Sequence, residues 1–164
     1  MDVVWEELTA GLIDARQLVH VLIRLTAATL LGAVIGIQRE RAGKPAGLRT
    51  HMLVTLGTAV FVLACAGVGM SSDGLSRVIQ GLVTGIGFIG AGSILKLSEQ
   101  RDVQGLTTAA GVWMTAAVGV AVGLGSLGVA LLSTLFTLVI LSFSKRIESS
   151  ADKARAEEVE ARNN

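Results

Sequence analysis

The sequence has few charged residues, a single cysteine and no recognisable secretion signal. Charged residues make up 16% of the 164 residues, well below the usual quarter. The one cysteine, Cys65, excludes a disulfide within the chain and says nothing about the redox compartment. The chain begins MDVVWEELTAGLIDARQ, which is acidic, whereas a signal peptide begins with basic residues. The net charge of +1 gives no reason to expect a nucleic-acid partner.

Motifs for catalysis, metal binding and ion transport are missing as well. No serine lies in a nucleophile elbow, and no lysine lies in a Walker-type loop. His20 and His51 belong to no HxxxH motif and to no cluster with cysteine. We therefore expect no enzymatic activity, no cofactor and no metal site. The apolar runs also contain no aspartate or glutamate, which argues against a cation path or a carboxylate proton relay through a membrane.

Long runs without any charged residue are the dominant feature of the chain. They cover residues Thr50–Ser72, Val78–Leu95 and Val103–Ser144, and about 20 predominantly apolar residues are enough to cross a bilayer. The third run is too long for one helix and contains the turn sequence GLGS at residues 123–126. We predict an all-α, polytopic membrane helix bundle whose partner is the lipid bilayer. Its five transmembrane helices are expected at about residues 17–37, 48–70, 77–95, 104–122 and 127–143.

Basic residues are concentrated on one side of this five-helix arrangement. They occur in the loop after the first helix, in the loop before the fourth helix and in the tail. Short loops rich in Lys and Arg stay in the cytoplasm. We therefore predict an acidic periplasmic N-terminal segment at residues 1–16, a transmembrane bundle at 17–144 and a charged cytoplasmic tail at 145–164.

The segment GIGFIGAG, residues 85–92, has the spacing G-x-G-x-x-G of a dinucleotide-binding turn. Such a turn belongs between a strand and a helix in a parallel-sheet domain. That domain would leave four other membrane-length segments unexplained. The glycines of this segment are better explained as part of a membrane helix.

Glycines let helix backbones approach closely in lipid. On a helix of 3.6 residues per turn, Gly81, Gly85 and Gly92 share one face, and Gly87 and Gly90 lie on a different face. Close neighbours on two faces predict that the helix at 77–95 is central in the bundle. Contact between the copies of an oligomer is the alternative use of these faces. Two glycines of the first helix form a G-x-x-x-G and are expected to pack in the same way: Gly32 and Gly36.

The chain also contains an internal similarity at an offset of 58 residues. The sequence GLRT at residues 47–50 corresponds to GLTT at residues 105–108. Helices one and three would then be equivalent, as would helices two and four. This predicts two parallel hairpins related by an axis along the membrane normal, followed by an unpaired fifth helix.

The strongest chemical feature lies where the second and fourth helices begin. A helix N-terminus favours an anion because of its free N–H groups and its dipole. Four basic residues surround the start of the second helix: Arg39, Arg41, Lys44 and Arg49. Gly47 would allow close backbone approach and Thr50 could cap the helix or donate a hydroxyl. The equivalent residues of the fourth helix are Gly105, Thr107 and Thr108.

If the two hairpins pack side by side, both helix starts converge on one cytoplasm-facing site. We expect this site to bind an anion, such as phosphate, a phospholipid head group or a partner's carboxylate. The alternative is that these residues only cap helices and fix the topology. Glu40, which lies between two arginines, is expected to pair with them rather than to coordinate a cation.

One further charge, Arg24, lies inside the first predicted helix. An arginine within a membrane is costly and usually faces the bundle interior or water. Asp73, at the turn before the third helix, is its best candidate partner, and the acidic residues of the N-terminal segment are another. The alternative is that Arg24 extends outward to the membrane surface and anchors the helix.

Three blocks carry a family resemblance: GAVIGIQRERAGKPAGLRTHMLVTLGTAVF, GIGFIGAGSIL and GLTTAAGVWMTAAVGVAVGLG. With these blocks in order, the chain closely resembles the MgtC/SapB family of bacterial inner-membrane proteins. The resemblance implies a protein linked to growth in low magnesium and, in pathogens, to survival inside host cells. It also implies that the chain belongs with the short members, which lack a soluble C-terminal domain.

This resemblance favours a non-enzymatic regulator or accessory protein of the inner membrane. Such a protein would act through helix-face contacts, in a homo-oligomer or with another membrane complex, or by binding an anionic ligand at the basic site. The alternative is a transporter or channel for an ion or small solute. Magnesium transport has the least support, because no span contains a carboxylate.

Overall fold

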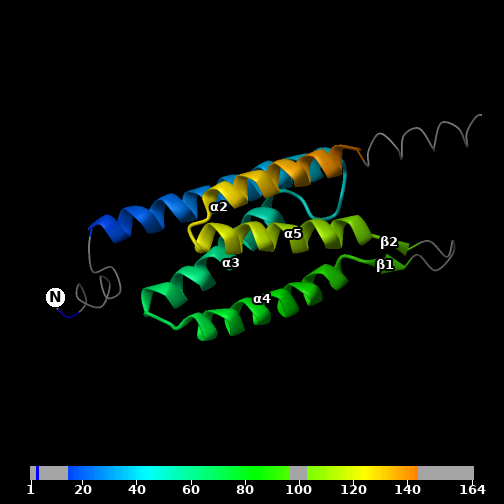
Figure 1. Ribbon diagram of the computed structural model, residues 1–164. Helices are drawn as coiled ribbons and strands as arrows, with labels where there is room; N and C mark the ends of the chain where they lie inside the picture. Colours follow the sequence, from blue (N-terminus) through cyan, green and yellow to red (C-terminus); the bar gives the residue numbers. More distant parts are fainter. Residues whose placement is uncertain (1–2, 4–14, 97–102, 144–164) are drawn as a thin grey trace, which may run out of the picture.

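The computed structural model describes Val3 and residues 15–96 and 103–143, whose helices run along one long axis (Figure 1). The four longest helices are α2 (Ala15–Arg41), α3 (Leu48–Gly67), α4 (Ser72–Gly92) and α5 (Leu106–Gly123). A shorter apolar helix, Leu127–Phe143, follows them. Most of the predicted N-terminal segment, the loop residues 97–102 and the tail from residue 144 lie outside the described residues.

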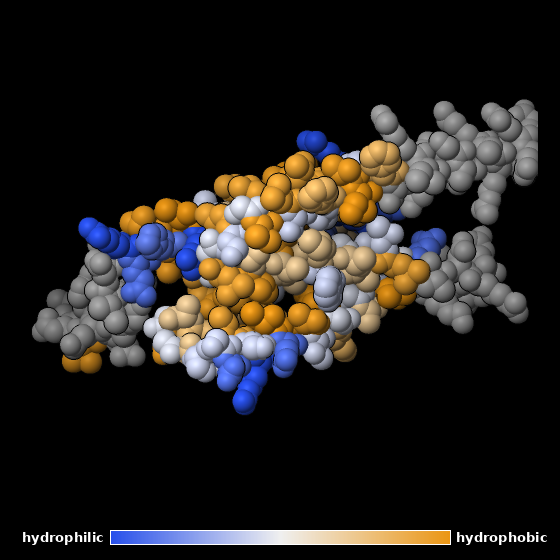
Figure 2. All heavy atoms as spheres, viewed as in Figure 1, coloured by the Kyte–Doolittle hydropathy of each residue, from blue (hydrophilic) through white to orange (hydrophobic). Residues whose placement is uncertain are grey.

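The predicted all-α membrane fold is confirmed. Each of the four long helices is long and apolar enough to cross a membrane, and the shorter helix lies where the fifth span was predicted. Two-residue strands, β1 (Leu95–Lys96) and β2 (Val103–Gln104), pair in antiparallel fashion between α4 and α5. Figure 2 shows that hydrophobic residues cover much of the visible surface along the bundle. Exposed side chains such as Phe61, Phe88 and Phe136 suit an apolar surrounding.

Two helix boundaries differ from the predicted ones. α2 continues through Arg41 instead of ending near residue 37, so that Arg39 belongs to a helix and not to a loop. α4 begins at Ser72 instead of residue 77. The reason at α4 is a side-chain cap: Ser71 Oγ accepts a hydrogen bond from Gly74 N at 3.2 Å, and such a cap allows the first turn of a helix to be polar.

Helices α3 and α5 lie parallel at the centre of the bundle. Gly119 of α5 packs against Thr55 and Thr58 of α3. One turn further along, a side chain at Gly123 would place its Cβ only 2.7 Å from Val62 Cβ. Of the apolar window of α5, 50% is buried, compared with 11% for α4. The core of the bundle is therefore built around α5 and its glycines.

Helix α2 packs against α3 through the predicted glycines Gly32 and Gly36. A Cβ at Gly32 would lie 2.7 Å from His51 O, and a Cβ at Gly36 would lie 2.6 Å from Leu48 Cα. The helix Leu127–Phe143 runs beside α2 (Figure 1). Its Ala130 and Leu141 belong to the same buried cluster as residues of α2.

The prediction that the helix at 77–95 is central is wrong. α4 lies along one edge of the bundle (Figure 1). Of its predicted packing glycines only Gly90 has a close neighbour, because a Cβ added there would lie 3.6 Å from Ala109 Cβ. The other four face open space: Gly81, Gly85, Gly87 and Gly92. Small residues permit close approach but do not say which neighbour makes it.

The pairing of the helices has the symmetry that a two-hairpin repeat requires. α3 and α5 form the central parallel pair, while α2 packs on α3 and α4 packs on α5. In a repeat, α3 and α5 would be equivalent inner helices, and α2 and α4 equivalent outer helices. The repeat itself stays a prediction.

Candidate functional site

The described bundle has two chemically different ends, which we name after two arginines of α2. At the Arg39 end, α2 finishes and both α3 and α5 begin. At the Arg24 end, α3 and α5 finish and α4 begins. The predicted anion site belongs to the Arg39 end. The structure brings the starts of α3 and α5 to the end of α2 there, because Glu40 bonds Leu48 of α3 and Arg39 bonds Thr108 of α5.

Arg39 is inside the bundle and not on its rim. Only 2% of its surface is exposed, and its Nη2 donates a hydrogen bond to Thr108 Oγ1 at 3.0 Å. Because α2 continues through this point, Arg39 lies on the same helix face as the buried residues Gly32 and Ile35. Arg39 and Thr108 therefore join α2 to α5, which differs from the cytoplasm-facing role that the sequence suggested for them.

Glu40 occupies the start of α3. Its Oε2 accepts a hydrogen bond from Leu48 N at 2.9 Å, so it fills an N-terminal position that an external anion would use. Gly47 makes this contact sterically feasible, because a Cβ at that position would lie 2.9 Å from the same oxygen. The sequence predicted that Glu40 pairs with the adjacent arginines. The structure assigns its carboxylate to the helix start.

The remaining predicted site residues line the outer part of this end. Arg41, Arg49 and Thr107 are exposed, while Lys44 and Thr50 are half-buried. Gly105 has a left-handed φ of +99°, and a Cβ there would lie 3.0 Å from Ser93 C. Gly105 thus serves the turn into α5. Only the exposed basic side chains stay available to an external anion.

A set of buried polar side chains, which we call the buried polar column, runs between α2, α3 and α5. None of its members is more than 6% exposed. It consists of Arg39, His51, Thr55, Thr58, Thr108 and Thr115. In a bilayer such groups need internal partners, because the surrounding lipid offers none.

The histidine of the column contacts a threonine of the facing helix α5. His51 Nδ1 lies 2.7 Å from Thr115 Oγ1, and Thr115 Oγ1 donates to Gly111 O at 2.8 Å. Thr115 Oγ1 is therefore within hydrogen-bonding distance of both the imidazole of α3 and the backbone of α5. The other ring nitrogen, Nε2, is buried with no hydrogen-bond partner among the described residues.

The sequence interpretation missed this column. It weighs His51 only as a metal ligand, assigns Thr108 to the anion site and does not consider Thr55 or Thr58. A signal is present in the spacing: His51, Thr55 and Thr58 recur every three or four residues in an otherwise apolar helix. The facing helix supplies Thr108 and Thr115, two turns apart.

The predicted pairing of Arg24 with Asp73 is replaced by a backbone contact. Arg24 Nη1 donates to Gly123 O at 3.0 Å, and no ion pair joins Arg24 to Asp73 in the part of the chain that the structure describes. The last carbonyls of a helix carry partial negative charge and attract cations. A guanidinium at the end of α5 is stabilised in this way without a carboxylate.

Gly125 is expected to be intolerant of substitution because of this contact. Its φ is +83°, and a Cβ there would lie 2.5 Å from Arg24 Nη2. Gly125→Ala should lower the free energy of unfolding by about 1–2 kcal/mol from the backbone alone. Thermal unfolding in detergent would measure this, with Gly128→Ala as the control, since a Cβ at Gly128 meets nothing within 4 Å. Equal stability of the two variants would contradict the assigned contact.

Comparison with known proteins assigns this architecture to a family. The sequence profile of the MgtC family matches residues 25–150, a range that includes α3, α4 and α5 in full, the larger part of α2 and the buried polar column. The chain belongs to the MgtC family. No solved structure matches it.

Three relatives illustrate the similarity. The chain is 47% identical over 139 residues to Protein SrpB of Synechococcus elongatus, an alignment that covers 78% of this chain and 76% of SrpB. It is 40% identical over 130 residues to the Escherichia coli K12 protein named Putative magnesium transporter YhiD, covering 73% of this chain and 58% of YhiD. It is 44% identical over 117 residues to Protein MgtC of Salmonella typhimurium LT2, covering 71% of this chain and 49% of that protein.

The match therefore extends over most of SrpB but only about half of the YhiD and MgtC relatives. The names of these relatives support an association of the MgtC family with magnesium.

Proposed function

We propose that this MgtC family member is a non-enzymatic regulator or accessory protein of the bacterial inner membrane that acts under magnesium limitation. Its N-terminus would be periplasmic and its C-terminus cytoplasmic. It would act by binding a transmembrane helix, from a second copy or from another membrane protein, through the outer face of α4. The observation that supports this most directly is the open space beside Gly81, Gly85 and Gly92.

Two properties of the bundle favour helix binding. First, small residues on a lipid-facing helix allow another backbone to approach closely, which drives association in bilayers. Second, the centre is tightly packed, and glycines of α5 lie directly against threonines of α3. The polar side chains there bond within the bundle, as Arg39 does to Thr108 and His51 to Thr115. A tightly packed bundle with one open, glycine-lined edge is better suited to binding a partner than to conducting a solute.

The exposed basic residues of the Arg39 end would add a second contact. Arg41 and Arg49 are the exposed basic side chains there among the predicted site residues. They would attract an anion, whether phosphate, a lipid head group or a carboxylate of the partner. This is a smaller site than the one the sequence suggested, because Arg39 and Glu40 are already engaged inside the protein.

The alternative function is transport of an ion or small solute. The name of the YhiD relative, Putative magnesium transporter, and the buried polar column both favour it. Reconstitution of the purified protein in liposomes would separate the two functions. Saturable magnesium or phosphate flux would support transport, and no flux above that of empty liposomes is expected for a regulator.

The α4 face is tested by enlarging one of its open glycines. Gly85→Leu should leave the bundle folded but prevent the protein from restoring growth in low magnesium to a bacterium that lacks its own family member. Gly128→Leu, an open glycine on another helix, is the matched control and should restore growth. Förster transfer between labelled copies in liposomes would show whether the partner is a second copy. Normal growth with Gly85→Leu would refute the proposed face.

A further inference from the structure

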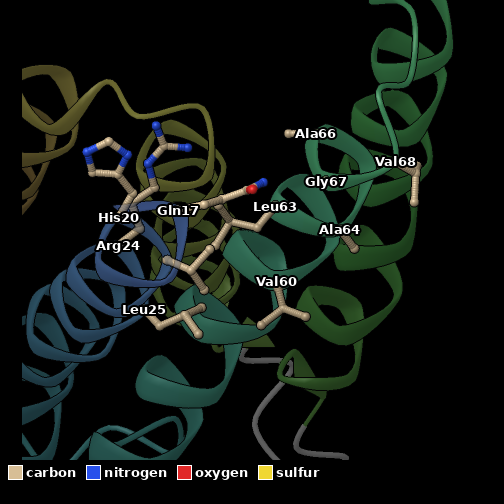
Figure 3. Close-up of a pocket in the computed structure, with 11 residues that line it drawn as sticks. Gln17, His20, Arg24, Leu25, Val60, Leu63, Ala64, Ala66, Gly67 and Val68 are labelled. Atoms are coloured by element: carbon tan, nitrogen blue, oxygen red, sulfur yellow. The ribbon is translucent and has the colours of Figure 1, made fainter. Parts of the chain in front are cut away.

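A pocket between α2 and α3 opens at the Arg24 end of the bundle, away from the basic residues of the Arg39 end (Figure 3). Its volume is about 570 Å³, which lies in the range of small-molecule sites. Its lining is mostly apolar, and three polar side chains of α2 complete it: Gln17, His20 and Arg24.

The polar and apolar parts of the pocket are separated in space. Gln17, His20 and Arg24 are spaced three and four residues apart, so they share one face of α2. Figure 3 shows their side chains gathered at one end of the pocket, with Leu25 and Val60 at the other end. This division matches a molecule with a polar head and an apolar chain.

Arg24 supplies the positive charge of the pocket and retains most of its donors. A guanidinium has five N–H groups, and Nη1 uses one of them for Gly123 O. The side chain is half-buried, so it is reachable from the pocket. No described residue that lines the pocket carries a carboxylate, so Arg24 has no acidic partner within it.

The depth of the polar end in the membrane follows from the helix ends. Gly67 and Val68, where α3 finishes, line the pocket, and Arg24 contacts Gly123, where α5 finishes. The 20 residues of α3 and the 18 residues of α5 are about as long as the hydrocarbon layer is thick, so these two helices end near its edge. Arg24 therefore lies near the level of the lipid head groups, and the apolar wall of Leu25, Val60 and Leu63 extends from there into the acyl-chain layer.

We propose that this pocket binds an anionic phospholipid of the adjacent leaflet. The head-group phosphate would accept hydrogen bonds from Arg24, with His20 and Gln17 as neighbouring polar contacts, and one acyl chain would lie against the α3 wall. Guanidinium groups bind phosphate through paired, charge-assisted hydrogen bonds. The apolar wall favours a lipid over a soluble anion, which has no group to place there.

The test is a comparison of ligands on the purified full chain in detergent, by thermal stabilisation and by native mass spectrometry. Phosphatidylglycerol should bind and stabilise the protein more than phosphatidylcholine with the same acyl chains. Inorganic phosphate should have little effect. Equal effects of the two lipids would overturn the proposal, and stabilisation by inorganic phosphate equal to that by phosphatidylglycerol would make this a small-anion site instead.

Two variants and one control test whether the lipid binds in this pocket. Arg24→Gln should weaken phosphatidylglycerol binding about tenfold, the loss expected for one charge-assisted contact. Arg77→Gln removes an exposed cation of α4 outside the pocket lining and should bind as the wild type does. Ala64→Trp should block the apolar part of the pocket and weaken the binding of both lipids. Because Ala64 is exposed on the pocket wall, this variant should fold even if Arg24→Gln does not. Unchanged lipid binding by Ala64→Trp would exclude the pocket.

Discussion

Replacing Gly32 by leucine is expected to prevent formation of the folded bundle, whereas Gly85→Leu should be tolerated. At Gly32 the new Cβ would overlap Thr55 Oγ1 and lie 2.7 Å from His51 O and 3.0 Å from Met52 Cα. Backbone atoms cannot rotate away as a side chain can, so α2 and α3 would have to separate. We expect a loss above about 3 kcal/mol, the upper range for overpacked cores.

The comparison is informative because both glycines were predicted from the sequence to be packing residues. At Gly85 an added Cβ meets nothing within 4 Å. Monodispersity in size-exclusion chromatography and the midpoint of thermal unfolding in detergent would measure both variants. If Gly85→Leu unfolds as readily as Gly32→Leu, then α4 is not at the edge of the bundle and the described packing is incorrect.

The second large effect is expected at Arg39. Arg39→Met keeps the length of the side chain but removes its hydrogen bond to Thr108, which the structure places inside the bundle at 3.0 Å. Hydrogen bonds to charged groups contribute about 1.5–3 kcal/mol to stability. Arg41→Met, two residues along the chain and exposed, is the control and should change stability by less than about 0.5 kcal/mol.

A double-mutant cycle with Thr108→Val isolates the pair. Burial of an arginine also carries a desolvation cost. The change in the free energy of unfolding of Arg39→Met therefore combines the lost hydrogen bond with the relief of this cost. The cycle removes that ambiguity, because it reports only the energy that depends on both side chains. A coupling of about 1.5–3 kcal/mol is expected, and a coupling near zero would show that Arg39 faces the rim after all.

The sequence by itself determined the order and approximate ends of the four long apolar helices and of the shorter helix that follows them. Long uncharged runs require helices in a bilayer, because only helices satisfy their own backbone groups there. The sequence also identified the family, through the blocks around GLRT and GLTT, and the close approach at Gly32 and Gly36. These conclusions depend on length, local spacing and local composition, which a sequence shows directly.

The tertiary structure alone decided which helix is central, where Arg39 lies and what Arg24 and Glu40 contact. Gly119 of α5 and Gly85 of α4 both lie in apolar helices that contain several glycines, yet only Gly119 has a neighbouring helix against it. The physical reason is that in a membrane protein both the lipid-facing and the helix-facing surfaces are apolar. Hydrophobic periodicity therefore does not separate inside from outside as it does in water, and only the arrangement of the helices shows which glycines and which charges are buried.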